Sequence, residues 1–268
     1  MHKALNVTCH FMTHTKKFIA YLDILGFKDL VQNNTHKRLF ELYDKLFTNI
    51  TTFAIGGKFN FIEKDGHRKA VYDSSQIILN SLIISDSIIL WTDDNSMKSF
   101  IDIVVGVKNI LNHHFITGVP LRGAIVEGHI DKINRTFLSN KDNSQITLIG
   151  LGLVQAYLKE NEQDWSGCIV DKSCIELFLS YVEEHKDSED VATLEYLVEK
   201  DLLLKYKAPL KSGNIKEEYV INWVKTPQNI IDEIRARKMF SEFNKSTDNW
   251  RAENIIRNTI DFINIASK

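Results

Sequence analysis

The chain has 268 residues, of which 44% are hydrophobic and 25% are charged, and its formal net charge is −2. This length and composition predict one large folded domain with an ordinary core. The balanced charge excludes a non-specific nucleic-acid binder, which would carry a strong excess of Lys and Arg. A single nucleotide needs only a local group of cations, so the composition leaves nucleotide binding open.

Cysteine usage and hydropathy indicate a reduced, cytoplasmic protein. Cys9, Cys168 and Cys174 form an odd, widely spaced set without a C-x-x-C pair, which is unlike a disulfide framework. No apolar run has the length of a membrane span, and the first residues lack the apolar stretch of a secretory signal. We therefore expect no association with a membrane.

The first third of the chain predicts a buried strand, a helix and a tight hairpin. Residues 18–24 form a near-continuous apolar run, which is typical of a strand covered on both faces. Residues 36–53 carry apolar side chains every three or four positions and predict an amphipathic helix. Residues 58–73 are mixed and predict a loop or weak hairpin. Two strands, 77–85 and 87–91, are expected around a turn at Asp86.

The rest of the chain predicts further helices and strands. Residues 97–113 predict a helix that the preceding polar residues, up to Ser96, can cap. The expected elements that follow are strands at 121–126 and 145–149, a helix at 150–160, a strand at 169–170, a helix at 174–182, a hairpin of 202–206 with 218–223, and helices at 228–243 and 249–265.

This order predicts an α+β sandwich with a mainly antiparallel sheet in the ferredoxin-like layout. We expect an N-terminal extension at 1–16, one main domain at 17–224 and a C-terminal helical extension at 225–268. In such a layout the first strand and the next hairpin are sheet neighbours. Their ends can therefore bring Asp23 and Asp86 together.

Asp23 and Asp86 are the candidate functional carboxylates. Each lies within a β-branched, apolar run, where an unpaired charge is costly. Two such carboxylates suit a Mg²⁺ or Mn²⁺ site that also holds a triphosphate. The alternative is structural, because Asp also caps strand ends and forms tight turns.

Several motifs resemble class III nucleotidyl cyclases in the correct order along residues 17–224. Phe18-x-x-x-x-Asp23-Ile-x-Gly26-Phe27 resembles the opening motif of that family, and Ser85-Asp86-Ser87 falls at its second metal aspartate. Residues 121–128 (LRGAIVEG), 150–160 (GLGLVQAYLKE) and 205–207 (KYK) resemble its later motifs. The chain looks most similar to the cyclic CMP and cyclic UMP cyclases of bacterial Pycsar antiphage systems.

The resemblance implies roles for individual residues. Asp23 and Asp86 would hold two Mg²⁺ or Mn²⁺ ions, helped by the carbonyl of Ile24. Gly26 and Phe27 would turn backbone N–H groups toward the phosphates. Attack by the ribose 3′-hydroxyl on the α-phosphate would then release pyrophosphate.

The candidate phosphate-binding cations are Arg122, Lys205 and Lys207, each of which could instead be an ordinary strand residue. Arg122 lies inside an apolar strand and could reach phosphate with its guanidinium fork.

Two departures from the family pattern leave alternatives open. The late helix has Val154 and Leu158 where the family has Asn and Arg, although a shift of one residue would supply Gln155 and Lys159. Leu82 stands where purine cyclases carry a base-reading Lys. That change fits a pyrimidine cyclase, and it fits an inactive purine site as well.

The resemblance also implies partners. We expect a nucleoside triphosphate as substrate, a homodimer with active sites shared between protomers, and a separate effector that binds the cyclic nucleotide. The alternatives are a purine cyclase, adenylyl or guanylyl, and a degenerate module that binds nucleotide without turnover.

Overall fold

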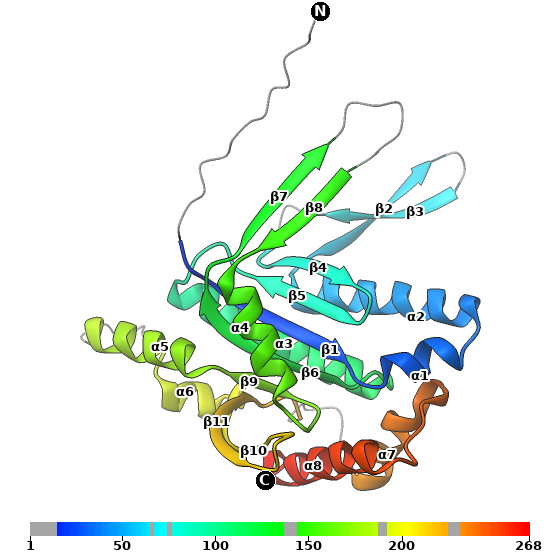
Figure 1. Cartoon of the computed structure of the whole chain (residues 1–268). Helices are drawn as coiled ribbons and strands as arrows, with labels where there is room; N and C mark the ends of the chain where they lie inside the picture. Colours follow the sequence, from blue (N-terminus) through cyan, green and yellow to red (C-terminus); the bar gives the residue numbers. More distant parts are fainter. Residues whose placement is uncertain (1–14, 65–66, 74–76, 137–143, 187–191, 225–230) are drawn as a thin grey trace, which may run out of the picture.

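A seven-stranded sheet forms the centre of the protein in the computed structural model (Figure 1). The structure describes residues 15–64, 67–73, 77–136, 144–186, 192–224 and 231–268. The strand order is β10-β11-β9-β6-β1-β5-β4. The strands are β1 (Lys17–Ile24), β4 (Asn80–Ile84), β5 (Ser87–Trp91), β6 (Leu121–Gly128), β9 (Cys168–Val170), β10 (Leu203–Pro209) and β11 (Ile215–Ile221).

The predicted α+β class and the ferredoxin-like layout are confirmed. Every neighbouring pair in the sheet is antiparallel except β6 with β9. The strands β6, β1, β5 and β4 lie side by side in the spatial order of the ferredoxin-like unit, with helices between β1 and β4 and between β5 and β6. This order makes β1 the direct neighbour of both β5 and β6, so three strand ends meet at one edge.

The alternation of side chains along β1 gives the sheet two apolar faces. Phe18, Ala20 and Leu22 belong to the larger core, whereas Ile19 belongs to a second, smaller cluster against which Tyr21 packs. Successive residues of a strand point to opposite faces, so Asp23 lies on the side of Ile19 and Tyr21. The expectation of a strand buried on both faces is confirmed.

Most helices contribute to the larger core. Besides the C-terminal helices described below, they are α1 (Phe27–Gln32), α2 (His36–Asn49), which continues as a π-helical turn at Ile50–Ala54, α3 (Met97–Ile116), α5 (Lys172–Glu184) and α6 (Leu194–Glu199). The hydroxyl of Ser96 accepts a hydrogen bond from the Ser99 N–H, so the predicted cap of α3 is present.

Helix α4 (Leu151–Asn161) lies against β6 and β1 and contributes Ala156 to the smaller cluster. Its approach depends on two glycines. A Cβ at Gly128 would come within 2.7 Å of the Gly152 Cα, and a Cβ at Gly152 would come within 2.4 Å of the Ile19 side chain. Neither position has room for a side chain, and this close packing brings the last turn of α4 over β6.

The C-terminal helices α7 (Glu233–Ser241) and α8 (Trp250–Ala266) pack onto the same body (Figure 1). Phe262 of α8 is fully buried, and its ring centroid lies 4.6 Å from that of Trp165. The Thr259 hydroxyl accepts a hydrogen bond from the Ser166 N–H at 2.8 Å. The C-terminal helices are therefore part of the packed core, while the domain boundary at 224/225 stays a prediction.

Some elements differ from the sequence-based expectations. Of the two alternatives for residues 58–73, the structure has the hairpin, formed by β2 (Lys58–Lys64) and β3 (His67–Asp73). The strand at 145–149 is β8 (Ser144–Ile149), and it pairs with an unexpected strand, β7 (Asp131–Thr136). The expected loop at 137–143 and the start of the helix expected at 228 lie outside the described residues. No helix among the described residues is both long and apolar enough to cross a membrane.

Candidate active site

Asp23 and Asp86 come from strand ends that meet at one edge of the sheet. Asp23 pairs with Ser87 across the β1–β5 ladder, and Asp86 occupies the two-residue turn just before Ser87. The backbone N–H of Ile24 donates a 3.0 Å hydrogen bond to the carbonyl oxygen of Asp86. The predicted convergence of the two residues is thus present in the fold.

The turn that carries Asp86 is held from two directions. Ser85 adopts a left-handed backbone conformation with a φ of 56°, which is uncommon for a residue other than glycine. The Tyr43 hydroxyl of α2 donates to the Ser85 carbonyl at 3.0 Å, and the hydroxyls of Tyr21 and Ser87 are 2.6 Å apart. These contacts fix the hairpin end relative to β1 and α2.

Arg122 lies directly opposite Asp23 in the β1–β6 ladder. Its Nε donates to the Glu160 carboxylate of α4, and its Nη1 donates to the Gln163 carbonyl at 3.2 Å. Its Nη2 is 3.8 Å from the Asp23 Oδ2, which is an ion pair without a hydrogen bond. Arg122, predicted to bind phosphate, is therefore at the site, with its Nε held by a buried carboxylate.

The Asp23 carboxyl is in an environment that disfavours its charge. Partial burial raises its pKa to about 7, and the negative charges of Glu160 and Asp86 contribute to this rise. The positive charges of Arg122 and Lys211 oppose it. Burial and the neighbouring carboxylates thus outweigh the effect of the cations on Asp23, and a bound divalent cation would relieve this imbalance.

Two residues of this site, Glu160 and Lys211, were not predicted. Lys211 lies in the β10–β11 turn, and its Nζ donates to the Asn161 side chain at 2.6 Å. Its backbone N–H donates to the Glu162 carbonyl at 2.9 Å, which ties that turn to the end of α4. An isolated Lys in a Lys-Ser-Gly-Asn turn carries no sequence signal for such a position.

Lys205 and Lys207 are not brought to Asp23 within one chain. Both belong to β10, the outermost strand, and three strands separate β10 from β1. At the usual spacing of neighbouring strands, β10 and β1 are therefore about 19 Å apart. The Lys205 Nζ lies 3.1 Å from the Glu217 carboxylate, and Lys207 is paired with Glu217 in the strand register. Their predicted role in nucleotide binding stays a prediction.

The Gly26–Phe27 turn follows Ile24 after one intervening residue, at the same end of β1. Gly26 has a φ of 75°, a conformation that glycine adopts without strain, and α1 begins at Phe27. A Cβ at Gly26 would lie 3.0 Å from the Lys245 side chain, which packs against this turn. The turn is therefore next to the aspartates, and the C-terminal segment supports it.

The α4 residues at the family's Asn and Arg positions are apolar and exposed. Val154 is 50% exposed and Leu158 is 53% exposed. A groove of about 520 Å³ runs beside α4, and Gln155, Leu158 and Lys159 line it.

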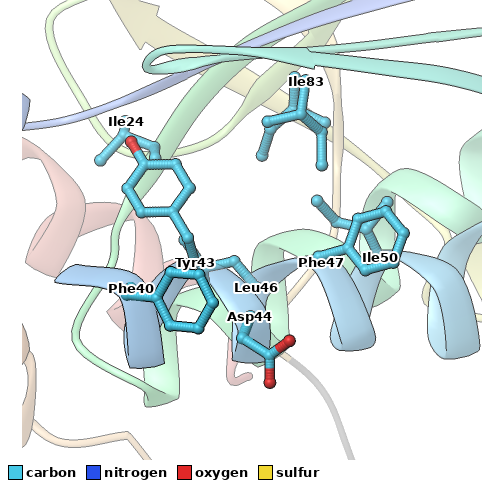
Figure 2. A pocket seen from close by; sticks show the side chains of 9 residues that line it. Ile24, Phe40, Tyr43, Asp44, Leu46, Phe47, Ile50 and Ile83 are labelled. Atoms are coloured by element: carbon cyan, nitrogen blue, oxygen red, sulfur yellow. The ribbon is translucent and has the colours of Figure 1, made fainter. Parts of the chain in front are cut away.

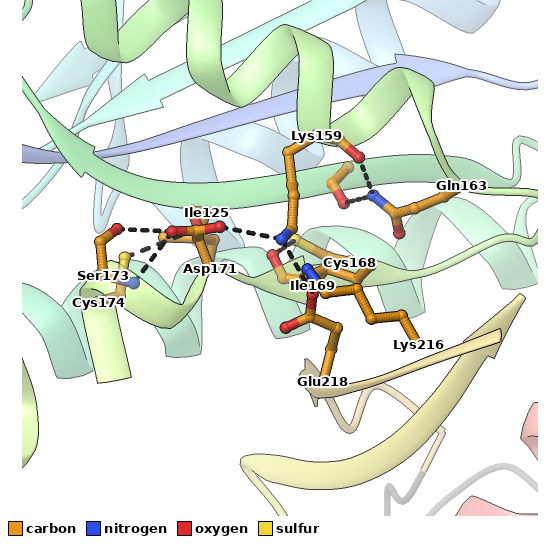
Figure 3. A network of polar contacts seen from close by, with 11 residues as sticks. Ile125, Lys159, Gln163, Cys168, Ile169, Asp171, Ser173, Cys174, Lys216 and Glu218 are labelled. Atoms are coloured by element: carbon orange, nitrogen blue, oxygen red, sulfur yellow. Dashed lines mark hydrogen bonds and ion pairs between the residues drawn. The ribbon is translucent and has the colours of Figure 1, made fainter. Parts of the chain in front are cut away.

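Lys159 is held in an ion-pair network (Figure 3). Its Nζ lies 3.0 Å from both the Asp171 and the Glu218 carboxylates. The Gln163 side chain donates to the Gly123 carbonyl at 2.7 Å, which fixes the segment after α4 to β6. Lys159 is thus already neutralised by two carboxylates.

A second hollow, of about 250 Å³, lies between α2 and the β4–β5 hairpin. Apolar side chains, including Ile24, Phe40, Phe47 and Ile83, surround it (Figure 2). Leu82, the predicted base-contacting residue, points to the opposite face and packs against the smaller apolar cluster. The hollow and Leu82 are therefore on different sides of the hairpin.

The donor set fits a divalent cation that is shared with a phosphate ligand. Within the described residues, no group of three or more His, Cys, Asp or Glu side chains could hold a metal ion. Mg²⁺, however, is commonly bound through one or two carboxylates together with substrate phosphates. Asp23 and Asp86 supply that number of carboxylates, in an environment where Asp23 lacks full charge compensation.

No family model and no curated protein matches the chain. Among solved structures it is similar to the guanylate cyclase domain of RhGC from Catenaria anguillulae, a structure in complex with GTP. The identity is 12% and the TM-score 0.46, over 78% of this chain and 96% of that one.

The dimeric guanylyl cyclase domain of the RhoGC fusion protein from Blastocladiella emersonii gives the same identity, TM-score and coverage. A bacterial light-regulated adenylyl cyclase is 13% identical, with a TM-score of 0.45, over 85% of this chain and 58% of that one.

Proposed function

We propose that this chain is a metal-dependent nucleotidyl cyclase, which forms a 3′,5′-cyclic nucleotide and pyrophosphate from a nucleoside triphosphate. The observation that carries the proposal is the meeting of Asp23 with the Asp86 turn through the β1–β5 pairing and the Ile24–Asp86 hydrogen bond. Asp23 and Asp86, with the carbonyl of Ile24, would hold the cations. Bound there, Mg²⁺ or Mn²⁺ would lower the pKa of the ribose 3′-hydroxyl and offset the triphosphate charge.

The rest of the site would bind and orient the triphosphate. Gly26 and Phe27 offer backbone N–H groups beside the aspartates, since the left-handed Gly26 turns the chain there. Arg122 and Lys211 are the cations that act on Asp23 within one chain. They would stabilise charge that grows on the phosphates.

A homodimer would complete this site. Leu151, Val154 and Leu158 expose apolar surface on α4, and half or more of each residue is accessible. A head-to-tail pair with twofold symmetry would bury this surface and could place α4 and the β10 lysines of one protomer at the aspartates of the other.

We propose UTP or CTP as the substrate and an antiphage second messenger, cUMP or cCMP, as the product, read by a separate effector in the cytoplasm. The support is the motif resemblance and Leu82, which offers no hydrogen bond to a purine. Leu82 alone does not exclude purines, so ATP and GTP are the alternative substrates.

A second candidate is a nucleotide-binding module without turnover. Its support is the apolar character of Val154 and Leu158 on α4, since neither side chain can stabilise charge on phosphate. Titration calorimetry that shows NTP binding without any product would favour it.

The test is an assay of the purified chain with Mn²⁺ and each of the four NTPs, separately and in competition. A cyclic nucleotide and pyrophosphate are expected from at least one, and a pyrimidine product should dominate the competition. If none of the four yields a cyclic product, the cyclase proposal fails.

A further inference from the structure

We propose that Glu160 is a positioning residue that holds Arg122 away from Asp23 and so keeps the Asp23 carboxylate available to a divalent cation. The inference rests on the proposed function, because it concerns the same metal site. It assigns a role to a buried acid that the cation would not itself contact.

The strand register places Arg122 where its guanidinium could pair with the Asp23 carboxylate. Asp23 and Arg122 are direct partners in the β1–β6 ladder, and side chains opposite each other in an antiparallel pair lie on one face. An Arg facing an Asp in this way would ordinarily close into a two-point hydrogen-bonded pair. Such a pair would occupy both carboxylate oxygens of Asp23.

In the structure, the Arg122 guanidinium donates its hydrogen bonds to groups other than Asp23. The Nε of Arg122 is hydrogen-bonded to the Glu160 Oε1, and its Nη1 is hydrogen-bonded to the Gln163 carbonyl. Only Nη2 faces Asp23, at 3.8 Å from Oδ2. The Asp23 carboxylate therefore accepts no hydrogen bond from Arg122.

The burial and the charges of Glu160 and Arg122 also support a positioning role for Glu160. Glu160 is 2% exposed and Arg122 is 6% exposed, so neither has bulk water as a partner. Glu160 is the hydrogen-bonded counter-ion of Arg122 within the protein, so the Arg122 guanidinium is not committed to Asp23. A buried ion pair is weak evidence for added stability, so its position beside two aspartates favours a role in the site.

Removing this contact should redirect Arg122. In Glu160→Asp the negative charge is kept, but the carboxylate is drawn back by one methylene and no longer reaches Nε. In Glu160→Gln the shape is kept and the charge is lost. In Glu160→Asp the guanidinium is free to close onto Asp23 and to compete with the cation. In Glu160→Gln the amide oxygen still accepts from Nε, but more weakly than a carboxylate, so the guanidinium is held less firmly and can shift toward Asp23.

The experiment is a Mn²⁺ titration of the full chain without nucleotide, with free Mn²⁺ followed by electron paramagnetic resonance. Both single variants should raise the Kd for Mn²⁺, and Glu160→Asp should do so by about tenfold or more, because an Arg122 guanidinium that pairs with Asp23 competes with the cation. The double variant Glu160→Gln/Arg122→Gln should return the Kd to within about twofold of the wild type, because no guanidinium remains to compete.

Glu218→Gln is the matched control. Glu218 is likewise a buried acid that contacts α4 through an ion pair, but its partners are Lys159 and Lys216. The Kd of the Glu218→Gln variant for Mn²⁺ should equal that of the wild type. Circular dichroism of each variant verifies folding, and Glu160→Asp keeps the test open if Glu160→Gln fails to fold.

The outcomes separate the two proposals. If the wild type binds no Mn²⁺, or if Asp23→Asn binds as well as the wild type, the proposed metal site itself is wrong. If the wild type binds through Asp23 but Glu160→Asp leaves the Kd unchanged, the positioning role is overturned, and a weaker Glu160→Gln would then reflect lost charge alone.

Discussion

The backbone N–H of Ile24 donates to the carbonyl oxygen of Asp86 at 3.0 Å, across 62 positions of sequence. This bond continues the β1–β5 ladder by one step beyond Asp23 and Ser87. It joins the end of β1 to the hairpin turn by a backbone hydrogen bond. The separation of Asp23 and Asp86 is therefore set by a sheet and not by a flexible loop, which suits a site that must hold its ligands in place.

Replacing either aspartate should abolish turnover. Asp23→Asn and Asp86→Asn keep the side-chain shape and remove one carboxylate each, so we expect kcat/KM to fall by about 10³-fold or more. Pyrophosphate release with Mn²⁺ and the preferred NTP measures the loss. Asp44→Asn is the control, since Asp44 is an exposed aspartate of the neighbouring helix α2. An Asp23 or Asp86 variant with activity near that of the control would contradict the assigned roles.

Asp23→Asn should stabilise the cation-free protein at alkaline pH. The folded-state pKa of Asp23 is raised to about 7, whereas an unfolded Asp titrates near its ordinary value of about 3.9. Between these values the folded state holds the additional proton, so the free energy of unfolding decreases as pH rises from about 4 to 7. Above pH 7 the variant should be more stable by on the order of 1–3 kcal/mol.

Thermal unfolding with a chelator present, at pH 4, 6 and 8, measures this effect. The advantage of Asp23→Asn should be greatest at pH 8 and absent at pH 4. Added Mn²⁺ should then stabilise the wild type and leave the variant unchanged. An equal difference in melting temperature at all three pH values would argue against a raised pKa of Asp23.

Lys245 should lower stability at neutral pH. This buried side chain donates to the Gly118 carbonyl at 2.9 Å, and burial lowers its pKa to about 7. An unfolded Lys keeps its proton to about pH 10.4, so between pH 7 and 10 the unfolded state holds the additional proton and stability rises with pH. Relative to Lys245→Met, the wild type should therefore gain stability over this range.

Urea unfolding at pH 7, 8.5 and 10 tests this prediction. The difference between the wild type and Lys245→Met should shift in favour of the wild type by on the order of 2–4 kcal/mol as pH rises. Lys28→Met, which changes an exposed lysine of α1, should show no such trend. A pH-independent difference for Lys245→Met would mean that this lysine keeps its ordinary pKa.

Leu158→Glu should weaken self-association. Leu158 is 53% exposed and belongs to the apolar surface of α4, and a buried unpaired charge in an interface is costly. Sedimentation velocity should show at least a tenfold rise in the dimer dissociation constant, about 1.4 kcal/mol. Ile234→Glu replaces an 80%-exposed residue of α7 and should leave the dimer intact. If Leu158→Glu associates as the wild type does, α4 is not in the interface.

The sequence by itself determined the α+β class, the buried first strand and the placing of Asp23 and Asp86 where strands end. Each of these follows from local patterns: the near-continuous apolar run of β1, and the tight turn between two apolar runs at residues 85–86. Such patterns hold because a strand must bury its apolar side chains whatever surrounds it. The antiparallel layout then brought β1 beside the hairpin, as the order of elements implied.

Only the tertiary structure decided the surroundings of those aspartates. Glu160 meets Arg122 from a helix 38 positions further along, and Lys245 packs against Gly26 from the far end of the chain. Neither contact leaves a periodic or local trace, because the side chains involved are ordinary members of their own segments. Their roles follow from the register of β1 with β6 and from the close Gly128–Gly152 approach of α4, since burial and charge act only between groups that the fold has already brought together.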